Sequence, residues 1–233
     1  SVGLAPILVP PTCHRSHGPP SGVLHVTSRN ARRAAASGAA FDACVAMLYV
    51  DKYRPKDLSE LNYHLHLTEQ LESLVASADV PHLLFYGPSG SGKKTRITCL
   101  LKALYGPGAH KLKVDQRVFL NPSKRKIEVN LISSNYHTEI TPSDAGIYDR
   151  LVIQDILKEI AQTQQVDQNA ARRFKTVVIN EADSLSRDAQ AALRRTMEKY
   201  MRNMRLILCA NSTSRIIAPI RSRCLLLRVG APK

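Results

Sequence analysis

Short apolar segments alternate with longer segments of helical spacing along most of the chain. Segments typical of buried strands lie at 81–86, 127–132, 176–179, 205–210 and 225–229. Segments with apolar side chains at helical spacing lie at 93–104, 148–162 and 187–200, and we expect a loop at 143–148. Because strands alternate with helices, the pattern predicts an α/β fold with a mostly parallel sheet between layers of helices.

Residues 1–46 differ in composition from the remainder of the chain. They contain Pro10-Pro11, Gly18-Pro19-Pro20 and an alanine-rich stretch, and their only acid is Asp42. A transit peptide is one interpretation, since such peptides are rich in arginine and poor in acids. A disordered extension, or translated upstream sequence before a start at Met47, is favoured because Pro and Gly interrupt an amphipathic helix. We therefore expect the folded domain to span residues 47–233.

The composition is that of a basic protein, which favours a polyanionic partner over a basic surface that binds nothing. The chain has 33 lysines and arginines against 19 acids, a formal net charge of +14, which favours nucleic acid or an acidic protein surface as partner. Its 5 cysteines form neither a CxxC pair nor a cluster with histidine, so we expect no zinc site and no disulfide framework. No apolar run reaches the roughly 18 residues of a transmembrane helix, so we expect no membrane partner.

A phosphate-binding loop is the strongest signal in the sequence. Gly87-Pro88-Ser89-Gly90-Ser91-Gly92-Lys93 follows the first strand and opens a helix. In this arrangement the glycines let backbone N–H groups surround the phosphates, and the lysine reaches the β and γ phosphates. A glycine-rich turn without a ligand fits this spacing less well. The loop therefore predicts binding of ATP or ADP.

The positions that should hold Mg²⁺ are altered. A Ser or Thr normally follows the loop lysine, but here Lys94 does, and Thr95 is turned about 100° away on the helix. The strand at 176–179 runs into Asn180-Glu181, with a neutral amide where the metal-binding aspartate normally stands. Glu181 remains a candidate base. We expect Mg²⁺ to be held weakly or not at all, with Thr95 as a weak candidate ligand, and hydrolysis to suffer more than binding.

An ordered set of motifs resembles the clamp-loader AAA+ ATPases, and within them the small subunits of replication factor C, most closely the one whose loop reads GKKT. The motifs are 49–55 (YVDKYRP), 87–95, 180–183, 188–198, 211–214 and 222–224 (SRC). The resemblance runs from about Met47 to the end. It implies a nuclear, ATP-binding subunit of a hetero-pentamer that loads a sliding clamp onto primer–template DNA for replication and repair. In the family a helical lid and a collar domain follow the ATPase domain, and we expect this chain to lack both.

The resemblance also implies roles for single residues. Asn211 would sense the γ-phosphate or the attacking water, and Arg223 would act in trans as an arginine finger for a neighbouring subunit. The implied DNA contacts are Arg194, Arg195, Lys199 and Arg202. The implied nucleotide contacts are Tyr53, Arg54, Pro55, Gly87, Pro88, Ser89, Gly90, Ser91, Gly92, Lys93, Lys94, Thr95 and Asn180.

Three functions remain open at this point. The favoured one is a clamp-loader subunit that binds ATP, hydrolyses it poorly, and serves its neighbour through Arg223. The alternative is an autonomous, competent P-loop ATPase or nucleotide kinase, which Mg²⁺-dependent turnover by the isolated chain would favour. The third is a basic DNA-binding module, which would bind DNA in a salt-sensitive way without nucleotide. A further basic cluster, Lys124-Arg125-Lys126, is interpreted as a solvated loop.

Overall fold

The centre of the fold is a seven-stranded sheet with strand order β2-β3-β4-β5-β6-β1-β7. The computed structural model describes residues 48–77, 79–120, 126–162, 172 and 174–232. The strands are β1 (His82–Tyr86), β2 (Lys113–Leu120), β3 (Lys126–Ser133), β4 (His137–Ile140), β5 (Lys175–Ile179), β6 (Met204–Ala210) and β7 (Cys224–Arg228). The five strands from β4 to β7 in this order are parallel, and β3 pairs antiparallel with both β2 and β4.

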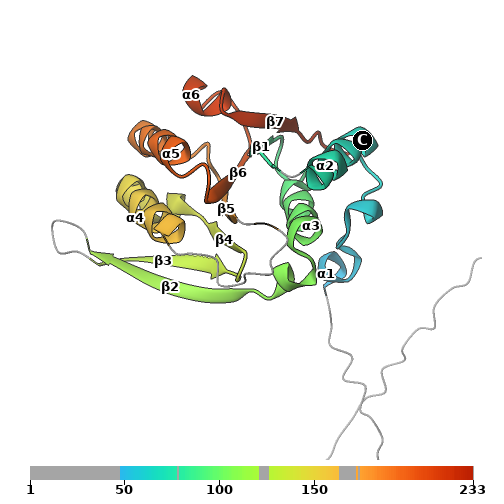
Figure 1. Ribbon diagram of the computed structural model, residues 1–233, viewed down its shortest axis with the longest axis horizontal. Helices are drawn as coiled ribbons and strands as arrows, with labels where there is room; N and C mark the ends of the chain where they lie inside the picture. Colours follow the sequence, from blue (N-terminus) through green and yellow to red (C-terminus); the bar gives the residue numbers. More distant parts are fainter. Residues whose placement is uncertain (1–47, 78, 121–125, 163–171, 173, 233) are drawn as a thin grey trace, which may run out of the picture. The chain divides into compact units, whose positions relative to one another are not determined.

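Helices cover both faces of the sheet (Figure 1). α4 (Asp149–Gln162) and α5 (Arg187–Lys199) lie on one face, and α2 (Leu65–Ala76) and α3 (Lys93–Tyr105) lie on the other. Short elements complete the described chain: α1 (Tyr49–Tyr53), α6 (Ala218–Arg221), η1 (Leu58–Glu60), η2 (Pro107–His110) and η3 (Pro142–Tyr148). The predicted α/β fold, a largely parallel sheet between two layers of helices, is confirmed.

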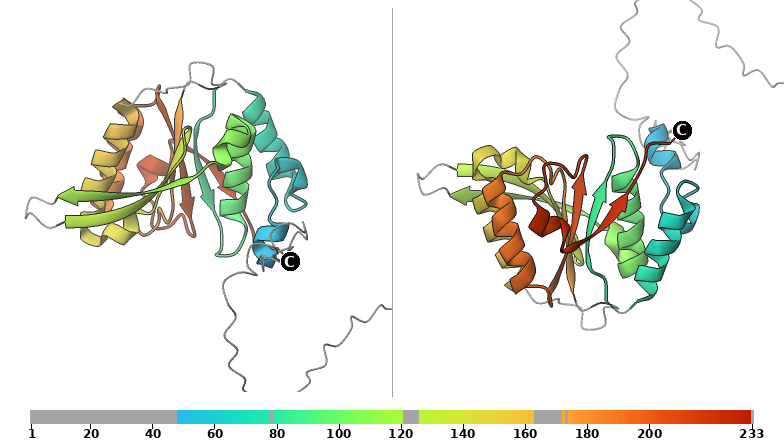
Figure 2. Two further views of the ribbon diagram at one scale, coloured as in Figure 1. Left: turned by 90° about the horizontal axis from the view of Figure 1, so that it is seen from below. Right: turned by 90° about the horizontal axis from the view of Figure 1, so that it is seen from above.

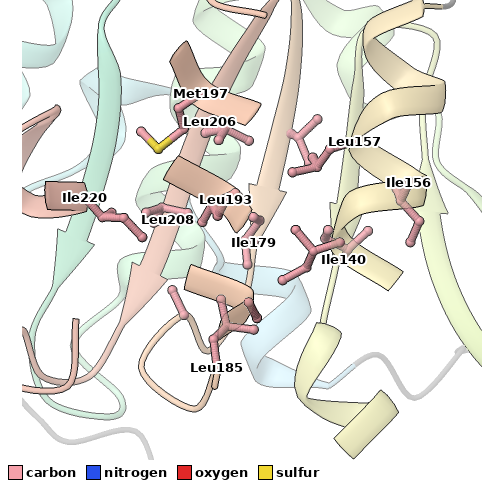
Figure 3. Packing of buried hydrophobic residues seen from close by; sticks show 14 of the residues in the cluster. Ile140, Ile156, Leu157, Ile179, Leu185, Leu193, Met197, Leu206, Leu208 and Ile220 are labelled. Carbon is pink, nitrogen blue, oxygen red and sulfur yellow. The ribbon is translucent and has the colours of Figure 1, made fainter. Parts of the chain in front are cut away.

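The central strands are buried on both faces. Ile179 packs with Leu157 of α4 and Leu193 of α5 (Figure 3), whereas its neighbour Val178 belongs to the apolar cluster under α3. A parallel strand buried on both sides reads as an unbroken apolar run. This is why the strand at 176–179 could be predicted from sequence.

All the predicted strands and helices are present, with bounds within one residue of the expected ones. α2, β2 and β4 were not predicted, and the stretch at 143–148, expected to be a loop, lies in η3. β2 exposes Val114 and Val118 to solvent, and β4 has only four residues, so neither produces a strong apolar signal. The extension at 1–46 and Lys124-Arg125 lie outside the described residues. No helix in the described part of the chain is both long and apolar enough for a membrane span.

Candidate functional site

The loop after β1 requires glycine at its first position. A Cβ on Gly87 would lie 1.8 Å from the carbonyl oxygen of Val229, and its φ is +157°. The approach is close because the Val229 N–H donates to the Tyr86 carbonyl at 2.8 Å, which continues the pairing of β1 with β7. At the other end of the loop Gly92 (φ 83°) is the N-cap of α3, and no side chain caps this helix. The first N–H groups of α3 therefore face the loop, where they favour an anion.

Lys93 is a buried cation held by neutral oxygens. Its side chain is buried, and its Nζ donates to the carbonyl oxygens of Gly87 at 2.7 Å and Pro88 at 2.8 Å, and to Oδ1 of Asn211 at 3.0 Å. No ion pair to Lys93 occurs among the described residues. A buried charge without a counter-charge is unfavourable, so this position favours an incoming anion. The structure also brings together Lys93 and Asn211, two predicted site residues that are far apart in sequence.

The two residues after Lys93 have partners of their own. Lys94 Nζ lies 3.4 Å from Oε2 of Glu139 on β4. The Thr95 hydroxyl accepts a hydrogen bond from Nε of Arg54 at 3.3 Å. A cation already directed at this hydroxyl disfavours Thr95 as a metal ligand. No cluster of three His, Cys, Asp or Glu side chains that could hold a metal exists in the described part of the chain.

The acidic segment after β5 is linked to the loop after β6. The Asn211 N–H donates to Oδ2 of Asp183 at 3.3 Å. Glu181 adopts a left-handed backbone conformation (φ 51°), unfavourable for a non-glycine residue, and its Oε2 accepts from the Ser143 hydroxyl at 3.2 Å. Sequence analysis assigned no role to Ser143 or Asp183. Both form long-range contacts that no local pattern indicates.

A small pocket of about 240 Å³ lies beside the phosphate-binding loop. Its lining residues are Pro55, Leu61, Tyr63, Gly90, Ser91, Gly92, Thr95, Arg96 and Pro232. Arg96 is buried and supports this wall by donating to the Thr68 hydroxyl at 3.0 Å and to the Tyr63 carbonyl. The size and mostly apolar lining suit an aromatic ring next to phosphates. Both views of Figure 2 place α1 beside the C-terminal end of the described chain.

The predicted nucleotide contacts at 53–55 are brought to this pocket only in part. Pro55 lines it, and Arg54 is bonded to Thr95, which also lines it. Tyr53 is 67% exposed and stacks on Tyr49, with ring centroids 6.1 Å apart, so it does not line the pocket. Leu61, Tyr63 and Arg96 were missed by sequence analysis. No sequence pattern singles out Arg96, because α3 also carries Lys93, Lys94 and Lys102.

Arg223 lies at the opposite end of the parallel strands from the phosphate-binding loop. It directly precedes β7, whereas the loop follows β1, and the two strands are parallel neighbours. Five strand residues span about 16 Å. Arg223 therefore cannot reach a nucleotide bound at the loop of its own chain.

Arg223 pairs with Glu198, a carboxylate on α5. Its Nη2 lies 2.6 Å from Oε1 of Glu198, and its Nη1 donates to the Pro219 carbonyl at 2.8 Å. Arg194 Nε also contacts Oε1 of Glu198, at 3.3 Å. The hydrogen bond from Arg194, together with the Arg223 charge, holds the pKa of Glu198 below its ordinary value. Of the remaining predicted DNA contacts, Arg195 and Arg202 are exposed, and Lys199 Nζ lies 5.3 Å from the Tyr200 ring centroid.

Comparison with known proteins gives a consistent result. Residues 63–233 match the family described as "DNA polymerase III, delta subunit". Replication factor C subunit 5 of Neurospora crassa is 68% identical over 185 residues, which are 79% of this chain and 53% of that protein. Replication factor C subunit 3 of Homo sapiens is 59% identical over 79% of this chain and 52% of that protein. The chain thus spans about half the length of the curated relatives it matches.

The solved structures include a more distant neighbour. The RuvB Holliday junction branch migration motor of Thermotoga maritima aligns with a TM-score of 0.47 at 16% identity, over 76% of this chain and 48% of that one. The family match, by contrast, extends over most of the sequence and covers the loop, the acidic segment and Arg223. The chain therefore belongs to the clamp-loader family described as DNA polymerase III delta subunit, and it is homologous to subunits 3 and 5 of replication factor C.

Proposed function

We propose that this chain is the ATP-binding domain of a replication factor C subunit that binds ATP with little or no hydrolysis and supplies Arg223 to a neighbouring subunit. The observation that carries this proposal is Lys93, a buried ammonium group at a phosphate-binding loop that only neutral oxygens hold. The three hydrogen bonds fix its position before a ligand arrives. A triphosphate then provides the missing negative charge.

The proposed roles follow the geometry of the site. Backbone N–H groups of the loop and of α3 bind the phosphates, and Lys93 neutralises the β and γ groups. The nucleobase of ATP lies in the pocket of about 240 Å³ lined by Pro55 and Tyr63. In this proposal Asn211 senses the γ-phosphate, which its hydrogen bond with Lys93 supports. Glu181, bonded to Ser143, is the remaining candidate base for an attacking water.

P-loop ATPases normally use Mg²⁺, and the residues here do not fit that ion. The position of the hydroxyl ligand holds Lys94, and the position of the aspartate ligand holds Asn180. Phosphoryl transfer depends on neutralising charge on the transferred group. Binding depends mainly on the loop and Lys93, which are intact. The proposed site therefore retains affinity and lacks catalytic power.

The proposed contribution to catalysis is made across a subunit interface. Arg223, released from Glu198, would stabilise the transition state at a neighbour's nucleotide. Arg194, Arg195, Lys199 and Arg202 would contact DNA phosphates without regard to base sequence. The proposed setting is a nuclear hetero-pentamer that loads a sliding clamp at primer–template DNA.

Equilibrium dialysis of the full chain against ATP, with DNA binding measured in parallel at two salt concentrations, tests this function. The proposal predicts saturable ATP binding at one site, together with weak, salt-sensitive DNA binding. DNA binding without any ATP binding would contradict it and favour a plain DNA-binding module.

In the assembled complex, Arg223→Gln should reduce ATP turnover at the neighbouring site by about 10³-fold or more and leave ATP binding to this chain unchanged.

A further inference from the structure

Glu139 is a buried carboxylate with no role in the function proposed above. It lies on β4 in register with Val178 of β5, and Val178 belongs to the apolar cluster under α3. Side chains in register on neighbouring strands point to the same face of a sheet, so Glu139 points toward α3. Its side chain is 7% exposed. The structure thus places a carboxylate inside the layer between the sheet and the nucleotide-binding helix.

Lys94 is the counter-ion of this carboxylate. Its Nζ lies 3.4 Å from Oε2 of Glu139, and this oxygen has no hydrogen-bond partner among the described residues. The contact is therefore an ion pair and not a well-formed hydrogen bond. A buried carboxylate without a cation is strongly unfavourable. A Ser or Thr at position 94 would leave Glu139 in that state, so the altered loop residue and the buried acid are complementary.

The remaining residues on this face agree with a site that holds no metal. Asn180 follows β5 two positions after Val178 and by strand alternation lies on the same face. It carries an amide, and the acid that pairs with Lys94 among the described residues is Glu139. The neighbouring His137 is buried, which lowers the pKa of its imidazole and keeps the ring neutral. Lys94 therefore brings a positive charge to the sequence position that supplies a Mg²⁺ ligand in other P-loop ATPases.

We propose that the Lys94–Glu139 ion pair replaces the divalent cation of this site, so that the chain binds a nucleoside triphosphate equally well with and without metal. This inference rests on the proposed function, because it concerns the same nucleotide. Glu139 acts as a positioning residue that holds the Lys94 ammonium group beside the sheet. The Lys94 side chain is 52% exposed, and its ammonium group has further N–H donors for the phosphate oxygens.

Calorimetric titration of the full chain with ATP, once in EDTA and once in excess Mg²⁺, tests the inference. The two dissociation constants of the wild-type chain should agree within about threefold. Lys94→Thr should weaken binding in EDTA by about tenfold or more and create a dependence on Mg²⁺. Lys94→Arg should retain metal-free binding. Lys102→Thr is the matched control, since Lys102 lies on the same helix and pairs with Asp57 at 2.6 Å; it should change neither constant.

Melting of the nucleotide-free chain supplies a readout that does not need ATP. Lys94→Met and Glu139→Gln should each lower the Tm, and the double variant should lower it by less than the sum, because each single change leaves its partner uncompensated.

In the titration, binding of ATP only in the presence of Mg²⁺ would overturn this inference alone. An unchanged EDTA affinity in Lys94→Thr would also overturn it. Failure to bind ATP in either buffer would instead contradict the proposed function.

Discussion

Two clusters of cations lie at opposite ends of the parallel strands, and they are held in different ways. At the phosphate-binding loop, Lys93 is buried and donates only to neutral oxygens. At the other end of the strands, Arg223 and Arg194 share the single carboxylate of Glu198 near the protein surface. The first cluster has positive charge that its surroundings do not cancel. The second already has a counter-charge within the chain.

The difference indicates how each cluster can be used. A ligand phosphate at the loop adds a missing charge without displacing an acid, so binding gains the full interaction with Lys93. For Arg223 to serve another molecule, its bond with Glu198 must first break. That cost is small because exposed ion pairs contribute little to stability. Lys93 therefore favours a bound anion, whereas the contact between Arg223 and Glu198 can be broken at small cost.

The largest expected effect concerns the backbone of the phosphate-binding loop at Gly87. Gly87→Ala places a Cβ against the Val229 carbonyl oxygen, and neither backbone can move without breaking the pairing of β1 with β7. We expect a loss of about 4 kcal/mol in the free energy of unfolding, measured by chemical denaturation. Gly230→Ala is the control. There the Cβ meets only the His64 ring at 3.2 Å, which can shift, so the loss should be about 1 kcal/mol or less.

The second-largest effect is a loss of stability in acid, caused by His82 at the start of β1. Burial, followed by the charge of Arg205, lowers the pKa of His82 to about 4 from an ordinary 6.5. The unfolded chain therefore binds this proton more readily, and stability is complete above about pH 6.5 and falls as the pH approaches 4. The loss should be on the order of 3 kcal/mol. Denaturation across this pH range checks it, and His82→Gln should flatten the curve.

A third prediction tests the charge of the loop directly. Lys93→Met removes the ammonium group and keeps the apolar stem, so ATP affinity should fall by about 100-fold, near 2.7 kcal/mol. The nucleotide-free chain should be no less stable than the wild type, since a buried charge without a counter-ion has been removed. Fluorescence titration and melting measure the two quantities. A variant that loses stability but keeps its affinity would reverse our interpretation of this cluster.

The smallest effect is expected at the second cluster. Glu198→Gln frees Arg223 and Arg194 but changes only exposed contacts, so the Tm should fall by less than about 2 °C. The difference from wild type should shrink further in 0.5 M salt because exposed pairs are screened. A large, salt-independent drop would mean that Glu198 is a structural residue and would remove the contrast between the two clusters.

The sequence was sufficient for the parts of the site that lie within one strand–loop–helix unit. Gly87 to Lys93 could be identified because spacing and context occur together in a short segment. Asn211 and Arg223 were identified only through the resemblance to a known family. In the structure, Asn211 contacts Lys93, whereas Arg223 pairs with Glu198 at the other end of the strands from the loop; its role toward a neighbour stays a prediction.

The residues that were missed act through tertiary contacts. Glu139 lies on β4, a strand too short and polar to be predicted, and its pairing with Lys94 depends on the register of β4 with β5. Ser143 reaches Glu181 from η3, a segment expected to be a loop. Tyr63 and Arg96 meet through a backbone carbonyl, which carries no sequence signal. Local patterns predict elements, whereas these contacts depend on how elements pack.

The most direct test of the account follows ATP binding and phosphate release by the wild-type chain in one cuvette, with and without Mg²⁺. The account predicts saturable binding of similar affinity in both conditions and no phosphate release above that of the Lys93→Met variant. Steady release that requires Mg²⁺ would contradict it. That result would mean that Glu181, Asp183 or Thr95 restores a metal site, and that the chain is a competent ATPase.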